Sequence, residues 1–275
     1  MNNLRLRQIC LVARDKSKIV EEFADVLDVR PVHGSGDLVA YGLPARGPMF
    51  EGGHKMLETL GVENLIFGAG ADFIEVLFPT RSDGSTVRLM ERRGGDTGYM
   101  LILQDDDIEP FVRRGEQAGI RIIHQADFPQ YRDVHFHPKD TGGALLSVAR
   151  HMPDNIVDGP WYPAGTAWET LPRSRIVTGI AAVELQSPDP QVLAERWGRI
   201  LGRPIERDGE NWLIALDDGV LRFVPAADGR GEGFSGFDLR VRDRRSVTST
   251  AARHGLHHDE SRVTMCGMRI GLVEE

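Results

Sequence analysis

The sequence has few cysteines, no long apolar run and no apolar N-terminal stretch. Of its 275 residues only Cys10 and Cys266 are cysteines, and no Cys-x-x-Cys pair occurs, which argues against a disulfide framework and a thiolate metal site. No run of eighteen apolar residues is present, so a membrane-spanning helix is not expected. Residues 1–5 also lack the apolar stretch of a secretory signal. We therefore expect a cytoplasmic protein with buried, reduced thiols.

The charged residues form no basic stripe. The formal net charge is −8, and the acidic residues are spread along the whole chain, which argues against nucleic acid as a partner. The glycine-rich stretches do not follow a strand and open a helix, so they do not indicate a nucleotide-binding loop. No Ser-His-Asp or Cys-His motif indicates a covalent mechanism. We expect a small-molecule substrate or ligand, no membrane partner and, as an open alternative, a homodimer.

A short strand, an aspartate and an amphipathic helix follow one another four times along the chain. The strand-to-aspartate segments are residues 9–15, 99–107, 182–189 and 237–243. The aspartates are suited to cap the helices, and strand-like runs rather than further helices come after each one. Each unit therefore has the predicted order βαβββ. Four such units predict an α+β fold of two paired modules, because a single unit would leave one face of its sheet uncovered.

We divide the chain into an N-terminal module over residues 1–150, a connecting segment over 151–174 and a C-terminal module over 175–275. The connecting segment contains four prolines together with Trp161 and Trp168, a composition that fits neither a sheet nor a helix. Its aromatic side chains have two interpretations. They pack the two modules together, or they close over a ligand as a lid.

Paired βαβββ units that curl into cup-shaped mixed sheets resemble the vicinal oxygen chelate superfamily. This superfamily includes glyoxalase I, methylmalonyl-CoA epimerase, extradiol dioxygenases and bleomycin-resistance proteins. The first 150 residues are most similar to the epimerase-like proteins, in residues 73–79, 89–108 and 137–146. The C-terminal module resembles the superfamily only in its pattern and is degenerate. The resemblance implies a cup that holds a divalent metal through four side chains, one on the first and one on the last strand of each unit.

The residues at these four metal-ligand slots depart from the epimerase-like pattern, which is His, Gln or Glu, His and Glu. The resemblance places Gln8, Glu75, Met100 and Ser147 there in the first module, and Ala182, Arg222, Gly236 and Gly271 in the second. A thioether and a hydroxyl replace neither an imidazole nor a carboxylate as metal ligands. We therefore expect no cofactor. A divalent metal on the two residual ligands, Gln8 and Glu75, stays open as an alternative.

Glu75 is the candidate catalytic residue, because a carboxylate in the middle of an apolar strand is costly unless it is paired or used. In this hypothesis Glu75 acts as the base, Gln8 and Ser147 orient a substrate oxygen, and Met100 lines the apolar wall. The loop over residues 44–53 is a candidate lid, from which Arg46, together with Lys55, would meet an anionic substrate.

Three histidines give an alternative metal site outside the family pattern. His135 and His137 share one face of a strand by the period-two rule, and His124 lies on the preceding run. A structural role is favoured for His137, which lies where a strand meets a turn.

Three functions compete at this point. The first is an isomerase, epimerase or lyase acting on a small oxygen-rich or acyl-thioester substrate with an eroded metal site. The second is a metal-free binding or resistance protein, which is favoured by the rings of Trp161, Trp168 and Trp212. The third is a ring-cleaving extradiol dioxygenase, which only the two-module length supports.

Overall fold

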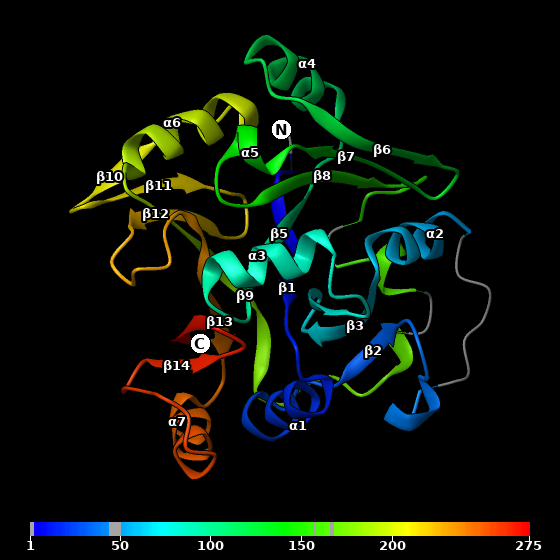
Figure 1. Ribbon diagram of the computed structural model, residues 1–275, viewed down its shortest axis with the longest axis vertical. Helices are drawn as coiled ribbons and strands as arrows, with labels where there is room; N and C mark the ends of the chain where they lie inside the picture. Colours follow the sequence, from blue (N-terminus) through cyan, green and yellow to red (C-terminus); the bar gives the residue numbers. More distant parts are fainter. Residues whose placement is uncertain (1–2, 44–50, 157, 166–167) are drawn as a thin grey trace.

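The computed structural model describes residues 3–43, 51–156, 158–165 and 168–275 (Figure 1). Over these residues the first sheet has eight strands in the order β2-β3-β4-β1-β5-β8-β7-β6. In chain order the strands are β1 (Arg5–Val12), β2 (Pro31–Gly34), β3 (Val62–Ala69), β4 (Asp72–Pro79), β5 (Thr97–Gln104), β6 (Ile122–Phe128), β7 (Tyr131–Phe136) and β8 (Leu145–His151). Strand β1 pairs in parallel with β4 and antiparallel with β5, and β5 pairs in parallel with β8. Two units therefore meet at β1 and β5.

The second sheet repeats this plan. Among the described residues it has seven strands in the order β10-β11-β12-β9-β13-β15-β14. These are β9 (Val177–Ser187), β10 (Glu206–Asp208), β11 (Asn211–Ala215), β12 (Val220–Pro225), β13 (Gly233–Val241), β14 (Arg262–Met265) and β15 (Met268–Glu274). The predicted α+β fold of paired units is confirmed. In the fourth unit two strands rather than three follow the helix, and the third is reduced to an isolated bridge between His258 and Val263.

The described residues form seven α-helices and three short 3-10 turns. They are α1 (Lys16–Leu27), α2 (Glu51–Leu60), α3 (Ser85–Arg93), α4 (Glu109–Gln117), α5 (Pro138–Thr141), α6 (Pro190–Leu201) and α7 (Arg244–Arg253), with short 3-10 turns η1 (Val39–Tyr41), η2 (Tyr162–Ala164) and η3 (Trp168–Thr170). Asp15, Asp189 and Asp243 each accept a hydrogen bond from the backbone N–H three residues on, as N-caps do. Asp107 stands one residue earlier than expected, before the N-cap Ile108 of α4.

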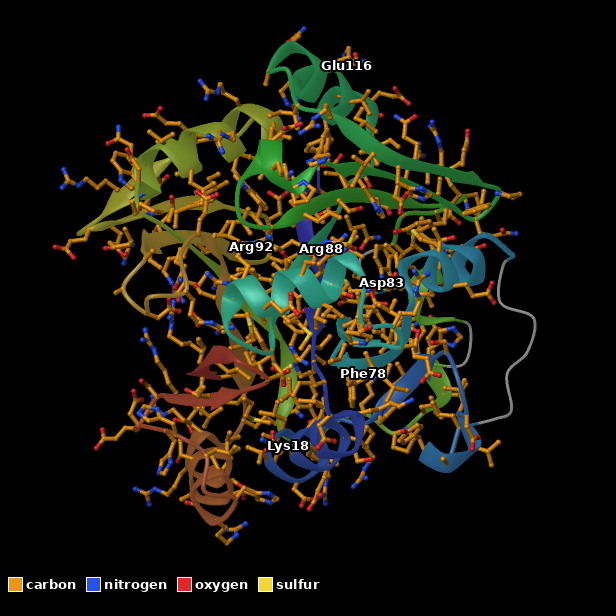
Figure 2. All side chains as sticks on the ribbon, in the orientation of Figure 1. Lys18, Phe78, Asp83, Arg88, Arg92 and Glu116 are labelled. Atoms are coloured by element: carbon orange, nitrogen blue, oxygen red, sulfur yellow. The ribbon has the colours of Figure 1, made fainter. Side chains whose placement is uncertain are left out.

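Helices from the two halves pack against each other in pairs, α1 with α7 and α4 with α6 (Figure 1). His254 on the loop after α7 lies 3.3 Å from Asp25 of α1, and the Arg114 side chain of α4 donates to the Ile200 carbonyl oxygen at the end of α6. Helix α3 buries Met90 with Val12 and presents Arg88 and Arg92 on its exposed side (Figure 2). Among the described residues no helix is long and apolar enough to cross a membrane.

Side chains alternate between two environments along β1. Ile9 and Leu11 belong to the large core that the two sheets and their helices share. Cys10 faces the other side, in a second cluster that contains Met100, Ile102 and aromatic residues of the connecting segment. This second side is the concave face on which the sequence places the site.

Asp72 joins the two sheets at a buried ion pair. Its Oδ1 lies 3.0 Å from Arg5 Nη2, and its Oδ2 accepts from the Ile180 N–H of β9 at 2.9 Å. Beside it Gly70 has a φ of 67°, and a Cβ there would lie 1.8 Å from the Thr178 carbonyl oxygen, so only glycine permits this approach. Burial raises the pKa of Asp72 to about 6, although the Ile180 N–H and Arg5 act in the opposite direction.

This raised pKa predicts a pH-dependent stability term. Below pH 3.8 Asp72 is protonated in both the folded and unfolded states; between 3.8 and about 6 the folded state holds the proton more tightly, so stability falls as pH rises, and above that window the term is constant. The free energy of unfolding of the wild type, measured relative to Asp72→Asn, should therefore fall by about 2 kcal/mol from pH 4 to pH 7. Urea unfolding at several pH values measures this difference. Parallel pH profiles of the two proteins would contradict it.

Candidate active site

A bulge in β1 brings two consecutive side chains to the concave face. The register with β5 shifts between Leu6 and Gln8, so Arg7 is the extra residue. Gln8 then stands opposite Ile102, and Cys10 stands opposite Met100. The Arg7 guanidinium is buried at 5.4 Å from the Trp161 ring and 5.9 Å from the Trp168 ring. The bulge thus gives β1 both a site residue and an anchor for the connecting segment.

Glu75 on β4 is held by three neutral donors. Its Oε2 accepts from Gln8 Nε2 at 2.8 Å and from Cys10 Sγ at 3.0 Å. Its Oε1 accepts from Asn64 Nδ2 of β3 at 2.6 Å. Among the described residues no cationic side chain forms an ion pair with it. The carboxylate is therefore fixed in orientation while its charge stays uncompensated.

The cysteine beside Glu75 is a neutral donor. Cys10 is buried, and burial together with the Glu75 charge raises the pKa of its thiol well above the ordinary value. Cys266 is also free and buried, and burial likewise raises its pKa. Neither thiol has the exposure or the lowered pKa that a nucleophilic cysteine requires.

Glu75 borders a cavity of about 150 Å³ on the concave face. Most of its walls are apolar, including Met100 and Ile102 at the centre of the sheet and Met56 and Leu57 of α2. The remaining lining residues are Gln8, Asn64, Ile66, His124, Ala126, Phe128, Tyr131, Asp133, His135, Tyr162 and Pro163. A largely apolar cavity with a few polar groups is the usual form of a small-molecule site.

The connecting segment packs on the concave face and contributes Tyr162 and Pro163 to the cavity wall. Trp161 is fully buried, and its Nε1 donates to Gln8 Oε1 at 2.7 Å. Tyr131 of β7 stacks on Tyr162 at 5.3 Å and meets Trp161 edge-on at 5.7 Å. Trp168 packs edge-on against Phe73 of β4. Tyr131 and Tyr162 supply part of the cavity wall, whereas Trp161 and Trp168 pack behind them in the same cluster on the concave face.

A second polar group lies on β6 and β7. Asp133 Oδ2 is 3.0 Å from His135 Nε2, and Asp133 Oδ1 is 4.0 Å from His124 Nε2. The two imidazole rings are 4.8 Å apart. His137 is not part of this group, because its Nδ1 accepts from the Lys139 N–H as the N-cap of α5. The predicted trio of histidines is therefore not assembled, and two of the three meet beside an aspartate.

The other predicted residues fall in several places. Met100 lines the cavity, whereas Ser147 is fully buried beside it, with a hydroxyl that has no partner within the described part of the chain. Arg46 and residues 44–50 of the predicted lid segment lie outside the described residues, whereas residues 51–53 begin helix α2. The Lys55 side chain is not described. Trp212 belongs to β11 of the second sheet and packs on the shared core.

The four predicted metal slots do not fit a metal ion. Both ends of the Gln8 amide are already engaged by Trp161 and Glu75, and the other two slots carry a thioether and a buried hydroxyl. Within the described ranges no group of three or more His, Cys, Asp or Glu side chains could hold a metal. Glu75 alone would remain as a strong ligand, and one carboxylate does not make a site for a divalent cation.

Ion pairs occupy the corresponding face of the second sheet. Arg222 lies 2.9 Å from Asp238 and 3.5 Å from Glu184. Arg269 lies 2.7 Å from Glu184 and 3.2 Å from Asp228. Ala182, Gly236 and Gly271 at the corresponding slots have no side chain that could bind a metal. The second sheet therefore lacks the ligands for the metal that a ring-cleaving dioxygenase needs.

The hydrogen bond from Trp161 to Gln8 generates a stability prediction. Trp161→Phe removes the donor and leaves Gln8 Oε1 buried without a partner, which should cost about 1–3 kcal/mol beyond the loss of packing. Trp168→Phe is the matched control, since Trp168 is also buried but forms no side-chain hydrogen bond among the described residues. Urea unfolding of both variants measures the difference. Equal losses would show that the bond adds nothing.

Several solved structures are similar to this chain. No family model and no curated protein matches the sequence. A mutant of 4-hydroxymandelate synthase from Streptomyces coelicolor aligns with a TM-score of 0.62 and 15% identity, over 95% of this chain and 77% of that one. A hypothetical protein from Staphylococcus aureus aligns with a TM-score of 0.62 and 10% identity, over 99% and 100% of the two chains.

A shorter alignment covers 54% of this chain and 89% of methylmalonyl-CoA epimerase from Mycobacterium tuberculosis, with a TM-score of 0.41 and 18% identity. Sequence identities of 10–18% support a shared fold and do not indicate a shared activity. Together with the paired units and the two mixed sheets, the full-length likenesses show that the chain has the vicinal oxygen chelate fold.

Proposed function

We propose that the protein is a metal-independent enzyme of the isomerase class, in which Glu75 removes a proton from carbon in a small substrate. The observation that carries this proposal is the uncompensated Glu75 carboxylate at the wall of an apolar cavity. Lyase and epimerase reactions begin with the same step. A positioned general base contributes about 10²–10⁴-fold to such a reaction.

The three donors prepare Glu75 for this role. Asn64 and Gln8 fix the carboxylate plane, so that little reorientation is needed when a substrate arrives. A buried carboxylate with a purely structural role is normally paired with a cation, as Glu184 of the second sheet is paired with Arg269. The contrast between the two sheets supports a functional rather than a structural reason for Glu75.

The charges around the cavity favour an uncharged substrate. Glu75 and Asp133 are acidic, and none of the described lining residues is lysine or arginine. A carboxylate or phosphate in the cavity would meet repulsion and lose its hydration without compensation. An uncharged aldehyde, ketone or thioester acyl group with an acidic C–H bond fits better.

A binding protein is the second candidate. The stacked pair of Tyr131 and Tyr162, with Phe128 next to Tyr162, gives the cavity a flat aromatic wall that suits a planar ligand. Such a protein would release its ligand chemically unchanged. The same wall would serve an enzyme equally well, so the test must detect proton transfer.

The elimination of 5-nitrobenzisoxazole tests Glu75 without knowledge of the natural substrate. A base takes the proton from C3 while the N–O bond breaks, and the cyanophenolate product is coloured. The wild type should accelerate this reaction, and Glu75→Gln should lower kcat/KM at least about 100-fold. Asn64 can accommodate the new amide by turning its unpartnered Oδ1 toward it, so we expect the variant to fold.

Glu91→Gln serves as the control, because it makes the same change at an exposed position of α3. It should leave the elimination rate unchanged. If Glu75→Gln binds the probe and eliminates it as fast as the wild type, the assignment of Glu75 as the base is wrong. If neither protein accelerates the reaction although the probe binds, the binding protein is the better description.

A further inference from the structure

The proposed function leaves the polar group on β6 and β7 without a role. His135 and Asp133 are both buried, and both line the same cavity as Glu75. Asp133 Oδ1 accepts from the Ala126 N–H at 3.1 Å, and its other oxygen meets His135 Nε2. The second ring nitrogen of His135 has no partner among the described residues. The arrangement is that of an imidazole oriented by a carboxylate.

The strand register places this group across the cavity from Glu75. A row of paired residues crosses the sheet from Gln8 through Ile102 and Ser147 to His135 and His124. Gln8 at one end of the row contacts Glu75, and Ile102 in the middle is apolar. Strands β4 and β7 are separated by three strands, so the two polar groups belong to opposite walls. The body of a ligand would rest between them.

Asp133 is the acidic neighbour of both imidazoles. Burial and the neighbouring His135 lower the pKa of His124, while Asp133 acts against them. The Tyr131 hydroxyl donates to Asp133, and burial raises the pKa of that hydroxyl well above the ordinary value, so Tyr131 stays neutral. Asp133 compensates a positive charge on either imidazole.

We infer that His135, oriented by Asp133, forms with the neighbouring His124 a second proton-transfer site that acts on the oxygen of a small uncharged carbonyl substrate whose C–H bond faces Glu75. This inference rests on the proposed function. It assigns the opposite wall of the cavity to the carbonyl oxygen of that substrate.

The step balances without a co-reactant. Glu75 takes the proton, and the electron pair of the C–H bond becomes the C=C bond of an enol. The π pair of the carbonyl moves to oxygen, which receives a proton from the protonated imidazole. In the return step the enol O–H gives its proton back to the imidazole, and the Glu75 carboxyl delivers a proton to carbon. This return step regenerates the substrate, and in D₂O the exchanged carbon carries deuterium.

Exchange of the α-protons of cyclohexanone in D₂O, followed by proton NMR, tests the inference. His135→Gln should lower the exchange rate about 10- to 100-fold. It should lower the exchange rate at least about tenfold more than it lowers the elimination of 5-nitrobenzisoxazole, because the nitrophenolate leaving group needs little help from an acid. His257→Gln, at an exposed position, is the control and should alter neither rate. His124→Gln, at a more accessible position than His135, provides a second variant if His135→Gln is unstable.

A binding readout separates this inference from the base assignment. In the Glu75→Gln protein, cyclohexanone should still shift the ring ¹⁵N signal of His135, because binding does not need the base. Two results together would overturn the inference while the proposed function stands. In the first, Glu75→Gln abolishes exchange whereas His135→Gln exchanges like the wild type. In the second, cyclohexanone does not shift the His135 ring signal of the Glu75→Gln protein. If Glu75→Gln retains both reactions, the proposed function fails and the inference fails with it.

Discussion

The side-chain amide of Gln8 holds the candidate site together. Its carbonyl oxygen accepts from Trp161, and its nitrogen donates to Glu75, so one buried group joins the connecting segment to the cavity carboxylate. Because both ends are engaged, the amide has a single orientation, and that orientation fixes which atom faces Glu75. The position of the Trp161 ring, the seal over the concave face and the orientation of the carboxylate all depend on this one group.

The corresponding faces of the two sheets carry different polar side chains. In the first sheet, a carboxylate and an imidazole pair stand in an apolar cavity, and neutral donors hold the carboxylate. In the second sheet the same face is occupied by ion pairs between Arg222, Arg269 and their acidic partners. The carboxylates on this face of the second sheet are paired with arginines, whereas Glu75 of the first sheet has no cationic partner among the described residues. This difference supports the first sheet as the place of any chemistry and the second as its structural partner.

Much of the fold could be predicted from local signals. The aspartate caps and the apolar periodicity recur four times, and three of the four aspartates cap as expected. The alternation along β4 predicts that Glu75 faces the cup, and the resemblance to the superfamily predicts the same for Gln8. The bulge at Arg7 could not be predicted, since one inserted residue depends on the register of the partner strand and leaves no mark in the periodicity.

The partners of the site residues were the part that sequence could not supply. Trp161 lies 153 residues from Gln8, and no local pattern links them. Asn64 of β3 donates to Glu75 of the neighbouring strand β4. A single asparagine near the start of a strand does not indicate such a contact in the sequence. Asp133 and His135 do carry a signal, the period-two spacing of two polar residues on one face of the strand, but the sequence prediction uses that spacing only for His135 and His137.

The most direct measurement of the central claim is a crystal structure of the protein with 6-nitrobenzotriazole, a stable compound whose N–H takes the place of a reactive C–H bond. The account predicts that the ring lies in the cavity over Ile102, with its N–H within about 3 Å of the Glu75 carboxylate. A ring bound elsewhere, or bound in the cavity with no hydrogen bond to Glu75, would contradict the claim that this carboxylate is placed to receive a proton.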